Sequence, residues 1–538
     1  MTGTKMRLGS ALGVAVLVLS AACSQDLAVT NPNNPDVSRA LASPADVQSL
    51  AVSSMNSWYM ASTYYDPWTA LSVTADNMTA NFGNFGMRFQ NVEPRIPYNN
   101  TASGADAEMA LQPWNRQYKA LGAANDVLRA VAAGVVLPGG DQYVDIARFA
   151  QAGSLMQLAL LYDKAFIVDE TFDATQGAPQ FSAYTDVAKA AQTKFDALIA
   201  ATSGKTFTYT DASTIIPLVG ATFNATTLNR MANTMNAMLL AYLPRNAADA
   251  AKVDWAKVLQ YADKGIGTGS AGAPFDMTIQ ADKNTWYSYI AFYFDDPTWM
   301  RIDQHLVHQM DSAVPDHFTG ALNPPSGNGD ARLGTDYKYE ATVIGDVTRG
   351  IWMQSPYSQN RYFAISQASP TNRVGPSPYI LAAENDLIKA EALVRTGGDL
   401  TLACSLINKT RVTRGKLTAA APTDGAAALL ADITYERQVE LTGTSGMNLF
   451  YVRHDDAVQA GTLRHMPVPG AELETDVVPY YTFGGVGTPD MNVSPLGTPS
   501  LAAVLERSAV KTIALPNGRL LQLHDGVHAE RVPGVLHW

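Results

Sequence analysis

The chain has 538 residues, of which 47% are hydrophobic and only 16% are charged, a composition typical of a folded globular protein. Its formal net charge is -11 and its isoelectric point is about 5.2, so its electrostatic field repels nucleic acid and anionic lipid. No basic cluster offsets that field, and we expect no nucleic-acid partner. The two cysteines, Cys23 and Cys404, exclude a framework of disulfide bonds. Cys404 lies among apolar residues of an expected helix and is predicted to be a small core residue.

The first residues have the three parts of a secretion signal. Lys5 and Arg7 give a positive start, an apolar run follows at 11–19, and small residues then lead into Cys23. The apolar run is about half as long as the roughly twenty residues that a membrane-spanning helix needs. We therefore expect residues 1–22 to be a signal peptide and the mature protein to work outside the cytoplasm.

Cys23 gives this leader a more specific meaning. Small residues directly before a cysteine look like a bacterial lipobox, in which the thiol is acylated and becomes the new N-terminus. Here Ser20 stands where leucine is usual, and Leu19 lies one place further from the cysteine. Because each buried methylene contributes about 0.8 kcal/mol, an acylated Cys23 would hold a soluble domain at a membrane surface. The alternative is an ordinary signal peptide in which Cys23 has no special role.

Residues 23–40 are expected to be a tether that leads to the folded domain. Their NPNNPD segment at 31–36 contains prolines, which favour extended backbone and remove hydrogen-bond donors. Ser43 followed by Pro44 is then typical of a helix start, with serine as the N-cap and proline at the first helical position.

Helical periodicity recurs along the rest of the chain. Apolar residues spaced for one helix face occur in blocks at 121–128, 146–160, 226–243, 380–394 and around 406–407. Gly397 and Gly398 mark a helix end between the last two blocks. Helix pairs of about 30 to 40 residues joined by such turns are typical of a helical-repeat scaffold of the tetratricopeptide kind, although the full consensus is absent.

Four long irregular stretches, rich in aromatic residues, asparagine and glycine, separate the helical blocks: 59–101, 271–304, 319–371 and 465–501. Loops of this length are uncommon in a compact domain unless they are functional. No linker divides the chain, so residues 41–500 are predicted to form one mainly all-α domain with long ligand-binding loops. Residues 501–538 form a C-terminal tail to which the sequence assigns no role.

Several short segments share a resemblance to one family. They are the tether and first helix at 26–50, the segment at 114–128, the helix pair at 379–392 and 406–411, and the block from ERQVEL (436–441) to NLFYVR (448–453), followed by MPVP at 466–469. Together they resemble the SusD/RagB family of outer-membrane nutrient-binding lipoproteins. Two features depart from it: residues 445–450 read SGMNLF where the family has Gly-His and Trp, and the tail replaces the usual short terminus.

The resemblance implies a helical scaffold with tetratricopeptide-like helix pairs and an irregular ligand-binding face. It implies a lipid-anchored protein of the outer membrane that binds oligosaccharides or similar nutrient polymers. It also implies a partner, a TonB-dependent outer-membrane transporter of the SusC type, over which the lipoprotein sits as a lid. The family performs no chemistry, so neither an enzymatic activity nor a cofactor is expected. Its ligands include peptides as well as glycans, and the sequence leaves that choice open.

Aromatic residues in the irregular stretches are the candidate ligand contacts. A sugar ring has an apolar face and a rim of hydroxyls, so its site needs flat aromatic platforms with polar neighbours. The alternative is that these aromatics fill the core between helices and loops. The predicted ligand-binding residues are Trp68, Asn81, Phe82, Phe85, Trp286 and Tyr287.

Two other function classes stay open as alternatives. One is an exported glycan hydrolase: Asp295 and Asp296 are adjacent, and such enzymes need two carboxylates across a bond, but with 49 acidic residues a chance pairing is expected. The other is a tetratricopeptide-like assembly scaffold without a small ligand. His305 and His308 have a spacing that suits one face of a metal site, yet a solvated helix face is the favoured interpretation, and no metal site is predicted.

Several charged residues are interpreted as structural. Asp330 or Asp336 could belong to a calcium site in a loop, since calcium prefers oxygen ligands, but nothing else in the sequence supports one. Buried or half-buried ion pairs are expected to lock the late helix to the aromatic segment that follows it. The residues concerned are Glu436, Arg437, Glu440 and Arg453.

Overall fold

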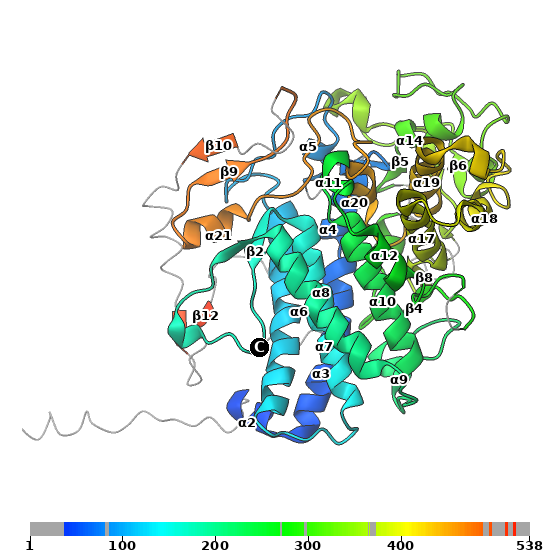
Figure 1. Cartoon of the computed structure of the whole chain (residues 1–538). Coiled ribbons are helices and arrows are strands. Elements are labelled where there is room, and N and C mark those ends of the chain that lie inside the picture. Colours follow the sequence, from blue (N-terminus) through cyan, green and yellow to red (C-terminus); the bar gives the residue numbers. More distant parts are fainter. Residues whose placement is uncertain are drawn as a thin grey trace, which may run out of the picture.

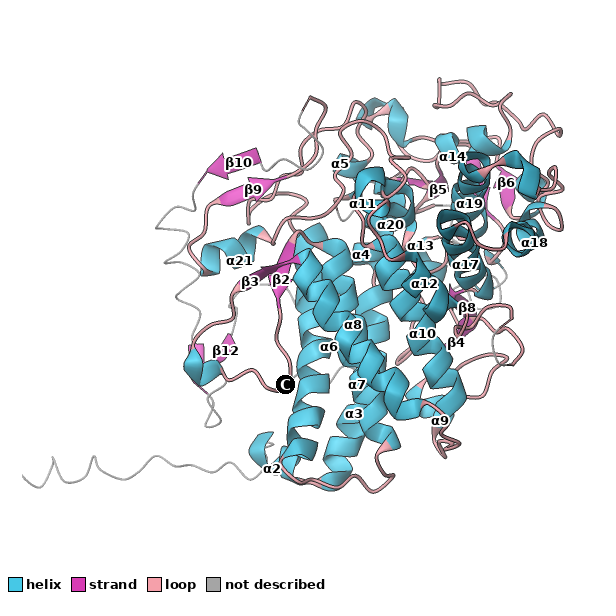
Figure 2. Cartoon of the chain, viewed as in Figure 1, coloured by secondary structure: helices cyan, strands magenta, loops and turns pink. Residues whose placement is uncertain are grey.

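Helices dominate the part of the chain that the computed structural model describes (Figures 1 and 2). The described residues are 37–80, 86–269, 272–294, 298–363, 365 and 373–487, together with strands at 494–497, 512–514 and 520–522. The predicted signal peptide, Cys23 and most of the tether and tail lie outside these residues. Among the helices that are described, none has both the length and the apolar character needed to cross a membrane.

The long helices pack against one another in chain order. α3 contacts α6 and α7, α7 contacts α8, and α8 contacts α10, so that these helices lie side by side (Figure 1). The series continues through α12 to α17, which packs on both α18 and α19. This succession confirms the prediction of a mainly α-helical scaffold. The helices of this series are α3 (Pro44–Thr63), α6 (Glu108–Ala132), α7 (Gln142–Leu161), α8 (Tyr184–Thr202), α10 (Ala225–Tyr242), the shorter α12 (Trp255–Ala262), α17 (Ala382–Thr396), α18 (Leu400–Arg411) and α19 (Ala426–Glu440).

Local sequence signals set the ends of these helices. The Ser43 hydroxyl accepts a hydrogen bond from the backbone N–H of Asp46 at 3.4 Å, and Pro44 opens α3, as predicted. An N-cap of this kind satisfies a donor that has no partner within the helix. At the C-terminal end of α17, Gly397 adopts the left-handed conformation with φ 63°, which glycine takes at little steric cost.

α7 lies at the centre of the main hydrophobic core, and nearly all of its residues are buried. Gly153 of α7 lets Trp58 of α3 approach closely, since a Cβ at Gly153 would lie only 2.4 Å from the indole Nε1. The Trp58 ring meets Phe149 edge-on, with 5.0 Å between the ring centroids. Cys404 is a buried free cysteine of α18, which confirms its predicted core role.

Short antiparallel strand pairs and short helices organise the segments between the long helices (Figure 2). The strand pairs are β1 (Met78–Thr79) with β5 (Arg301–Ile302), β2 (Lys164–Phe166) with β3 (Phe181–Ala183), β4 (Met277–Ala281) with β8 (Gly375–Ile380), β6 (Tyr337–Tyr339) with β7 (Tyr357–Gln359), β9 (Tyr480–Thr482) with β10 (Ser494–Gly497), and β11 (Thr512–Ala514) with β12 (Leu520–Gln522). The short helices are α2 (Val37–Ala42), α4 (Tyr65–Thr74), α5 (Met87–Gln90), α9 (Ala212–Ile215), α11 (Ala247–Ala250), α13 (Tyr289–Tyr293), α14 (Gln304–Met310), α15 (Arg332–Thr335), α20 (Asn448–Arg453) and α21 (Gly470–Thr475).

These segments carry a second hydrophobic core, which includes Trp68, Phe294 and Leu306 from α4, α13–β5 and α14. The expectation that 59–101 is irregular is wrong for its first part, because α3 runs to Thr63 and α4 follows. Buried backbone must have hydrogen-bond partners, and helix and strand pairing supply them inside this second core. The dense aromatic residues that suggested a loop are the side chains that fill it.

Buried ion pairs join α15 to α19. The Arg332 guanidinium lies 2.7 Å from a carboxylate oxygen of Asp330, 2.8 Å from Glu436 and 3.2 Å from Glu440. All four side chains are at most 3% exposed. Asp336 pairs with Arg361 and Arg414. The carboxylates of Asp330 and Asp336 are thus engaged by arginines, which explains their burial without a calcium ion.

A second buried pair links α19 to α17. Arg437 lies 2.6 Å from Glu391, and His454 lies 3.0 Å from the same carboxylate. Burial alone would raise the pKa of Glu391, but Arg437, His454 and Arg395 outweigh it and hold that pKa well below its usual range. The predicted structural ion pairs of Glu436, Arg437 and Glu440 are therefore confirmed.

The expectation of an ion pair for Arg453 is wrong, since among the described residues its guanidinium bonds only backbone. It donates to the carbonyls of Leu160, Tyr242, Pro244 and Arg464. Leu160 and Tyr242 belong to the last turns of α7 and α10, where carbonyls have no partner within the helix. Arg453 thus caps two helix ends and fastens α20 to them.

Replacing Arg332 by methionine should strongly destabilise the protein. The change would leave the carboxylates of α19 buried without their main counter-charge, at a cost of about 3–5 kcal/mol in the free energy of unfolding. The surface pair of Lys252 with Asp249, whose lysine side chain is 74% exposed, provides a control, and Lys252→Met should cost less than about 1 kcal/mol. Urea unfolding of both variants at pH 7 measures the difference, and equal losses would contradict it.

The buried Glu384 should make stability depend on pH. Its carboxylate accepts hydrogen bonds from the hydroxyls of Tyr242 at 3.1 Å and Ser445 at 3.3 Å, yet burial raises its pKa from 4.5 to about 7. Between those two pH values the folded protein keeps a proton that the unfolded chain has released, so stability falls as pH rises.

Glu384→Gln should remove this dependence. Relative to the wild type, the free energy of unfolding of the variant should rise between pH 5 and pH 8, by up to about 3 kcal/mol, because one pKa unit corresponds to 1.36 kcal/mol. Urea unfolding across that range tests it. A difference between the two proteins that stays constant with pH would show that Glu384 does not titrate in this window.

A candidate ligand-binding surface

Five partly exposed aromatic side chains lie next to one another where α4 begins and where α13 lies. They are Tyr65 of α4, Tyr287 just before α13, Tyr289 and Phe292 of α13, and Trp299 just after it. We call these five residues the aromatic surface. It draws on two segments more than 200 positions apart in the chain.

The rings of the aromatic surface form a continuous series. The ring centroids of Tyr65 and Tyr289 lie 5.9 Å apart, those of Tyr289 and Tyr287 4.9 Å, and those of Tyr287 and Phe292 6.4 Å. Phe292 and Trp299 follow at 5.7 Å with only 35° between their planes. Partly exposed rings in series offer several platforms to a ligand that is longer than one sugar or one side chain.

Buried aromatic residues support this surface from behind. Tyr64 is 6% exposed, and its ring centroid lies 4.1 Å from that of Tyr65 and 4.4 Å from that of Tyr289. Tyr293, also 6% exposed, lies 5.7 Å from Trp299. Because closely packed interiors hold side chains in single positions, the platforms are preorganised for a ligand.

Two arginines lie against these rings. The Arg116 guanidinium is 3.3 Å from the centroid of the Tyr64 ring, and the Arg373 guanidinium is 5.3 Å from that of Phe292. Cations prefer the electron-rich face of an aromatic ring. Arg116 thus contacts a supporting ring, and Arg373, itself only 7% exposed, contacts Phe292 of the surface. Sequence analysis missed both because they lie far from these aromatic residues in the chain.

The tyrosine hydroxyls of the aromatic surface stay uncharged near neutral pH. Burial raises the pKa of Tyr289 and of Tyr287 above the usual value, although Arg373 acts against the shift at Tyr287. A protonated phenol can both donate and accept a hydrogen bond. The surface thus combines flat apolar faces with neutral hydrogen-bonding groups.

The structure separates the predicted ligand residues. Tyr287 belongs to the aromatic surface, but Trp68 and Trp286 are only 1% and 3% exposed. The Trp68 indole donates to the Thr444 carbonyl at 2.9 Å, and Trp286 packs on Tyr59 at 5.3 Å between ring centroids. Both tryptophans thus have packing roles, the alternative that sequence analysis left open, and their predicted contact with a ligand stays untested.

The remaining predicted contacts, Asn81, Phe82 and Phe85, lie outside the described residues, as do Asp295 and Asp296. In the chain, the first three follow β1 of the second core and the two aspartates stand between Phe294 and Trp299.

His305 and His308, whose spacing would have suited one face of a metal site, have separate partners. His308 donates from Nδ1 to the Val314 carbonyl at 2.7 Å, whereas His305 lies near Glu93 and His317. Burial lowers the pKa of His305, but Asp303 and other nearby carboxylates outweigh it and raise that pKa to about 10. Sequence analysis missed this grouping, because Glu93 is more than 200 positions from both histidines in the chain.

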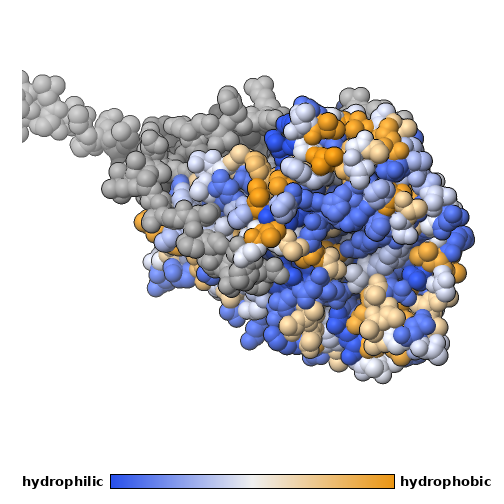
Figure 3. Space-filling model, turned by 90° about the horizontal axis from the view of Figure 1, so that it is seen from above, coloured by the Kyte–Doolittle hydropathy of each residue, from blue (hydrophilic) through white to orange (hydrophobic). Residues whose placement is uncertain are grey.

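The rings of the aromatic surface are partly exposed. A hollow of about 480 Å³ lies elsewhere, between α14 and α19, and Gln309, Tyr435 and Asp455 are among its lining residues. It contains a single aromatic side chain, so we place the candidate site at the aromatic surface on chemical grounds. On the face seen in Figure 3, apolar side chains form separate groups among hydrophilic ones.

Comparison with known proteins identifies the fold. No protein-family profile and no curated protein matches the sequence. Among solved structures, a SusD homolog from Bacteroides thetaiotaomicron aligns with a TM-score of 0.54 at 14% identity, over 80% of this chain and 96% of the other. The chain has a SusD-like fold.

Two further structures agree with that assignment. Surface glycan-binding protein A from Bacteroides uniformis aligns with a TM-score of 0.52 at 15% identity, over 77% of this chain and 90% of the other. A SusD-like carbohydrate-binding protein from Bacteroides fragilis also aligns with a TM-score of 0.52 at 15% identity, over 83% of this chain and 89% of the other. The SusD-like architecture implied by the scattered sequence segments is thus confirmed, at identities that establish the fold alone.

Proposed function

We propose that this SusD-like protein binds oligosaccharide chains at the aromatic surface and releases them unchanged. The observation that carries the proposal is the continuous series of partly exposed rings from Tyr65 to Trp299. Sugar rings present an apolar face that stacks on such platforms, and hydroxyls that pair with neutral polar groups. Two structures of the same fold are described by name as glycan- or carbohydrate-binding proteins.

The length of the ring series favours a polymer over a small molecule. Small ligands are bound in enclosed pockets that bury most of their surface, whereas the aromatic surface offers several rings side by side. Binding without a covalent step also agrees with the side chains of the aromatic surface. Its rings and its protonated tyrosine hydroxyls can contact a ligand, but none of them is an activated nucleophile.

The proposal extends to the place where binding occurs. The leader at 1–22 would direct export, acylation of Cys23 would anchor the protein in the outer membrane, and residues 23–40 would act as the tether. The bound glycan would then pass to a TonB-dependent transporter of the SusC type, which the SusD-like fold supports as the partner.

The ligand-binding proposal is tested by removing one platform. Trp299→Ala should weaken binding of the best ligand from a glycan array at least about tenfold, which corresponds to 1.4 kcal/mol. Phe207→Ala is the matched control, because Phe207 is also partly exposed and packs on one tyrosine, Tyr209 at 5.5 Å, but belongs to the segment before α9. Isothermal titration calorimetry of both variants measures the two affinities.

The same experiment separates the alternatives. Equal affinities for the two variants would place the ligand elsewhere, and binding only on a peptide array would replace the glycan by a peptide. Absence of any ligand on either array would favour an assembly scaffold. Shortened glycan products after incubation with the wild type would overturn the non-enzymatic assignment.

Lipid attachment makes a separate prediction. In a Gram-negative host, the wild type should incorporate an alkyne-labelled fatty acid and sediment with outer-membrane vesicles. Cys23→Ser should abolish both, because serine offers no thiol for acylation, whereas Cys404→Ser leaves the leader intact and should retain both. Labelling that survives in Cys23→Ser would contradict the anchor.

A further inference from the structure

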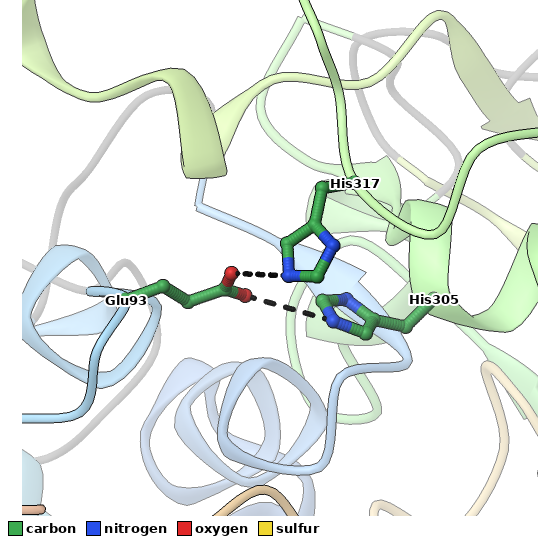
Figure 4. Close-up of side chains that lie close together, drawn as sticks. All are labelled: Glu93, His305 and His317. Atoms are coloured by element: carbon green, nitrogen blue, oxygen red, sulfur yellow. Dashed lines mark ion pairs between the residues drawn. The ribbon is translucent and has the colours of Figure 1, made fainter.

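A cluster of histidine and carboxylate side chains lies at the other end of α4 from the aromatic surface. Its members are Glu93 in the segment after α5, His305 at the start of α14, and His317 in the loop after α14 (Figure 4). One potential ligand atom from each lies within 4.8 Å of the others. Glu93 and His305 are partly exposed and His317 is exposed, so an ion from solvent can reach all three side chains.

The potential ligand atoms of the two histidines face the same carboxylate. His317 Nε2 lies 2.8 Å from one oxygen of Glu93, and His305 Nε2 lies 3.8 Å from the other oxygen. The two imidazole rings are 4.4 Å apart between centroids. Figure 4 shows both Nε2 atoms directed at the same carboxylate. Two imidazole nitrogens and one carboxylate oxygen are a donor set typical of protein-bound zinc.

His305 is oriented as a metal ligand would be. Its Nδ1 lies 2.7 Å from a carboxylate oxygen of Asp303, which leaves Nε2 facing Glu93. Asp303 is itself buried, and its backbone N–H donates to the Asn77 carbonyl at 3.0 Å, next to the β1–β5 pair. A carboxylate behind a ligating histidine fixes the ring and increases its basicity.

The charges around the cluster favour a cation. Asp316 lies 3.9 Å from His305 Nε2 and 3.3 Å from His317 Nδ1, and Gln459 donates to Glu93 at 3.1 Å. Among the described residues, neither lysine nor arginine pairs with Glu93. One divalent cation placed between these side chains would contact both imidazole rings and the Glu93 carboxylate together.

A second group of similar composition lacks this character. Glu391, His454 and Asp455 also come within ligand distance of one another, but Glu391 already pairs with Arg437 and both carboxylates pair with Arg395. Those arginines supply the positive charge that a metal would bring. A third group, Asp76 with Asp303 and His305, shares His305 with the cluster, and Arg95 pairs with its Asp76. Of the three groups among the described residues, the cluster at Glu93 is the one in which no arginine pairs with a member.

We propose that Glu93, His305 and His317 bind a zinc-class divalent metal ion, with Asp316 or water as the fourth ligand. On binding, Nδ1 of His305 would stay at Asp303, and its Nε2, which lies 3.2 Å from the Gln459 amide nitrogen, would bond to the metal in place of that contact. The site is structural: it fastens the segment that contains Glu93 to α14 and to the loop after it. That segment continues from residues 81–85, where three predicted ligand contacts lie, and Ala80 is joined to it by a hydrogen bond to Asn91 at 2.9 Å.

The test is a zinc titration of the untagged, metal-stripped mature chain at pH 7.5. The wild type should bind one Zn²⁺ at this site with a dissociation constant below about 1 μM, measured by competition with a fluorescent chelator. His317→Gln and Glu93→Gln should each weaken this binding at least about a hundredfold. His317 has a side chain that is 51% exposed, so its variant should keep the fold, which circular dichroism checks.

His308→Gln is the matched control. His308 lies one turn along α14 from His305 and belongs to none of the potential metal-binding groups among the described residues, so its variant should bind Zn²⁺ like the wild type. Because His524, His528 and His537 lie in the tail, a variant with glutamine at all three should also retain the site.

Binding of Co²⁺ in place of Zn²⁺ adds a spectroscopic readout. Visible absorption typical of four-coordinate cobalt should appear in the wild type and vanish in Glu93→Gln. A dissociation constant of the wild type for Zn²⁺ above about 100 μM would overturn the proposal. Binding of unchanged affinity in His317→Gln would overturn it as well. Neither outcome bears on glycan binding at the aromatic surface, which is assayed without metal.

Discussion

The arrangement of the late helices depends on guanidinium groups that neutralise the buried carboxylates of α19. Removing charges from water costs several kcal/mol for each ion, so α19 can lie in the interior only where Arg332 and Glu391 meet its charged residues. The requirement is geometric as well as electrostatic, because each ion must face its partner within hydrogen-bond distance. α15, α17 and α19 are thereby held in one relative position.

The end of α19 then positions the second core. Three side chains from other segments bond to the backbone of residues 438–444: Asn77 to the Gln438 carbonyl, Tyr337 to that of Val439, and Trp68 to that of Thr444. α4 is thus fixed by Trp68 within it and by Asn77 just after its end. The aromatic surface begins at the first residue of α4. The rigidity of the candidate ligand site follows from the buried charges behind it.

Much of the helical scaffold could be predicted from the sequence, because its signals are local. Ser43 with Pro44 and Gly397 mark helix ends through backbone geometry that neighbouring residues impose, and apolar periodicity of 3.6 residues locates the buried faces. The site was predictable only as a region. Aromatic density pointed to 284–299, yet nothing local distinguished the buried Trp286 from the partly exposed Tyr287 beside it.

The sequence by itself determined the helical content, the helix ends and the acidic, aromatic-rich character of the chain, since each depends on neighbouring residues or on composition. Tertiary structure alone decided which rings face solvent, which arginine meets which carboxylate, and that Glu93 lies beside His305 and His317. These contacts join positions up to several hundred residues apart. They depend on how whole elements pack, and a single sequence carries no local signal for that.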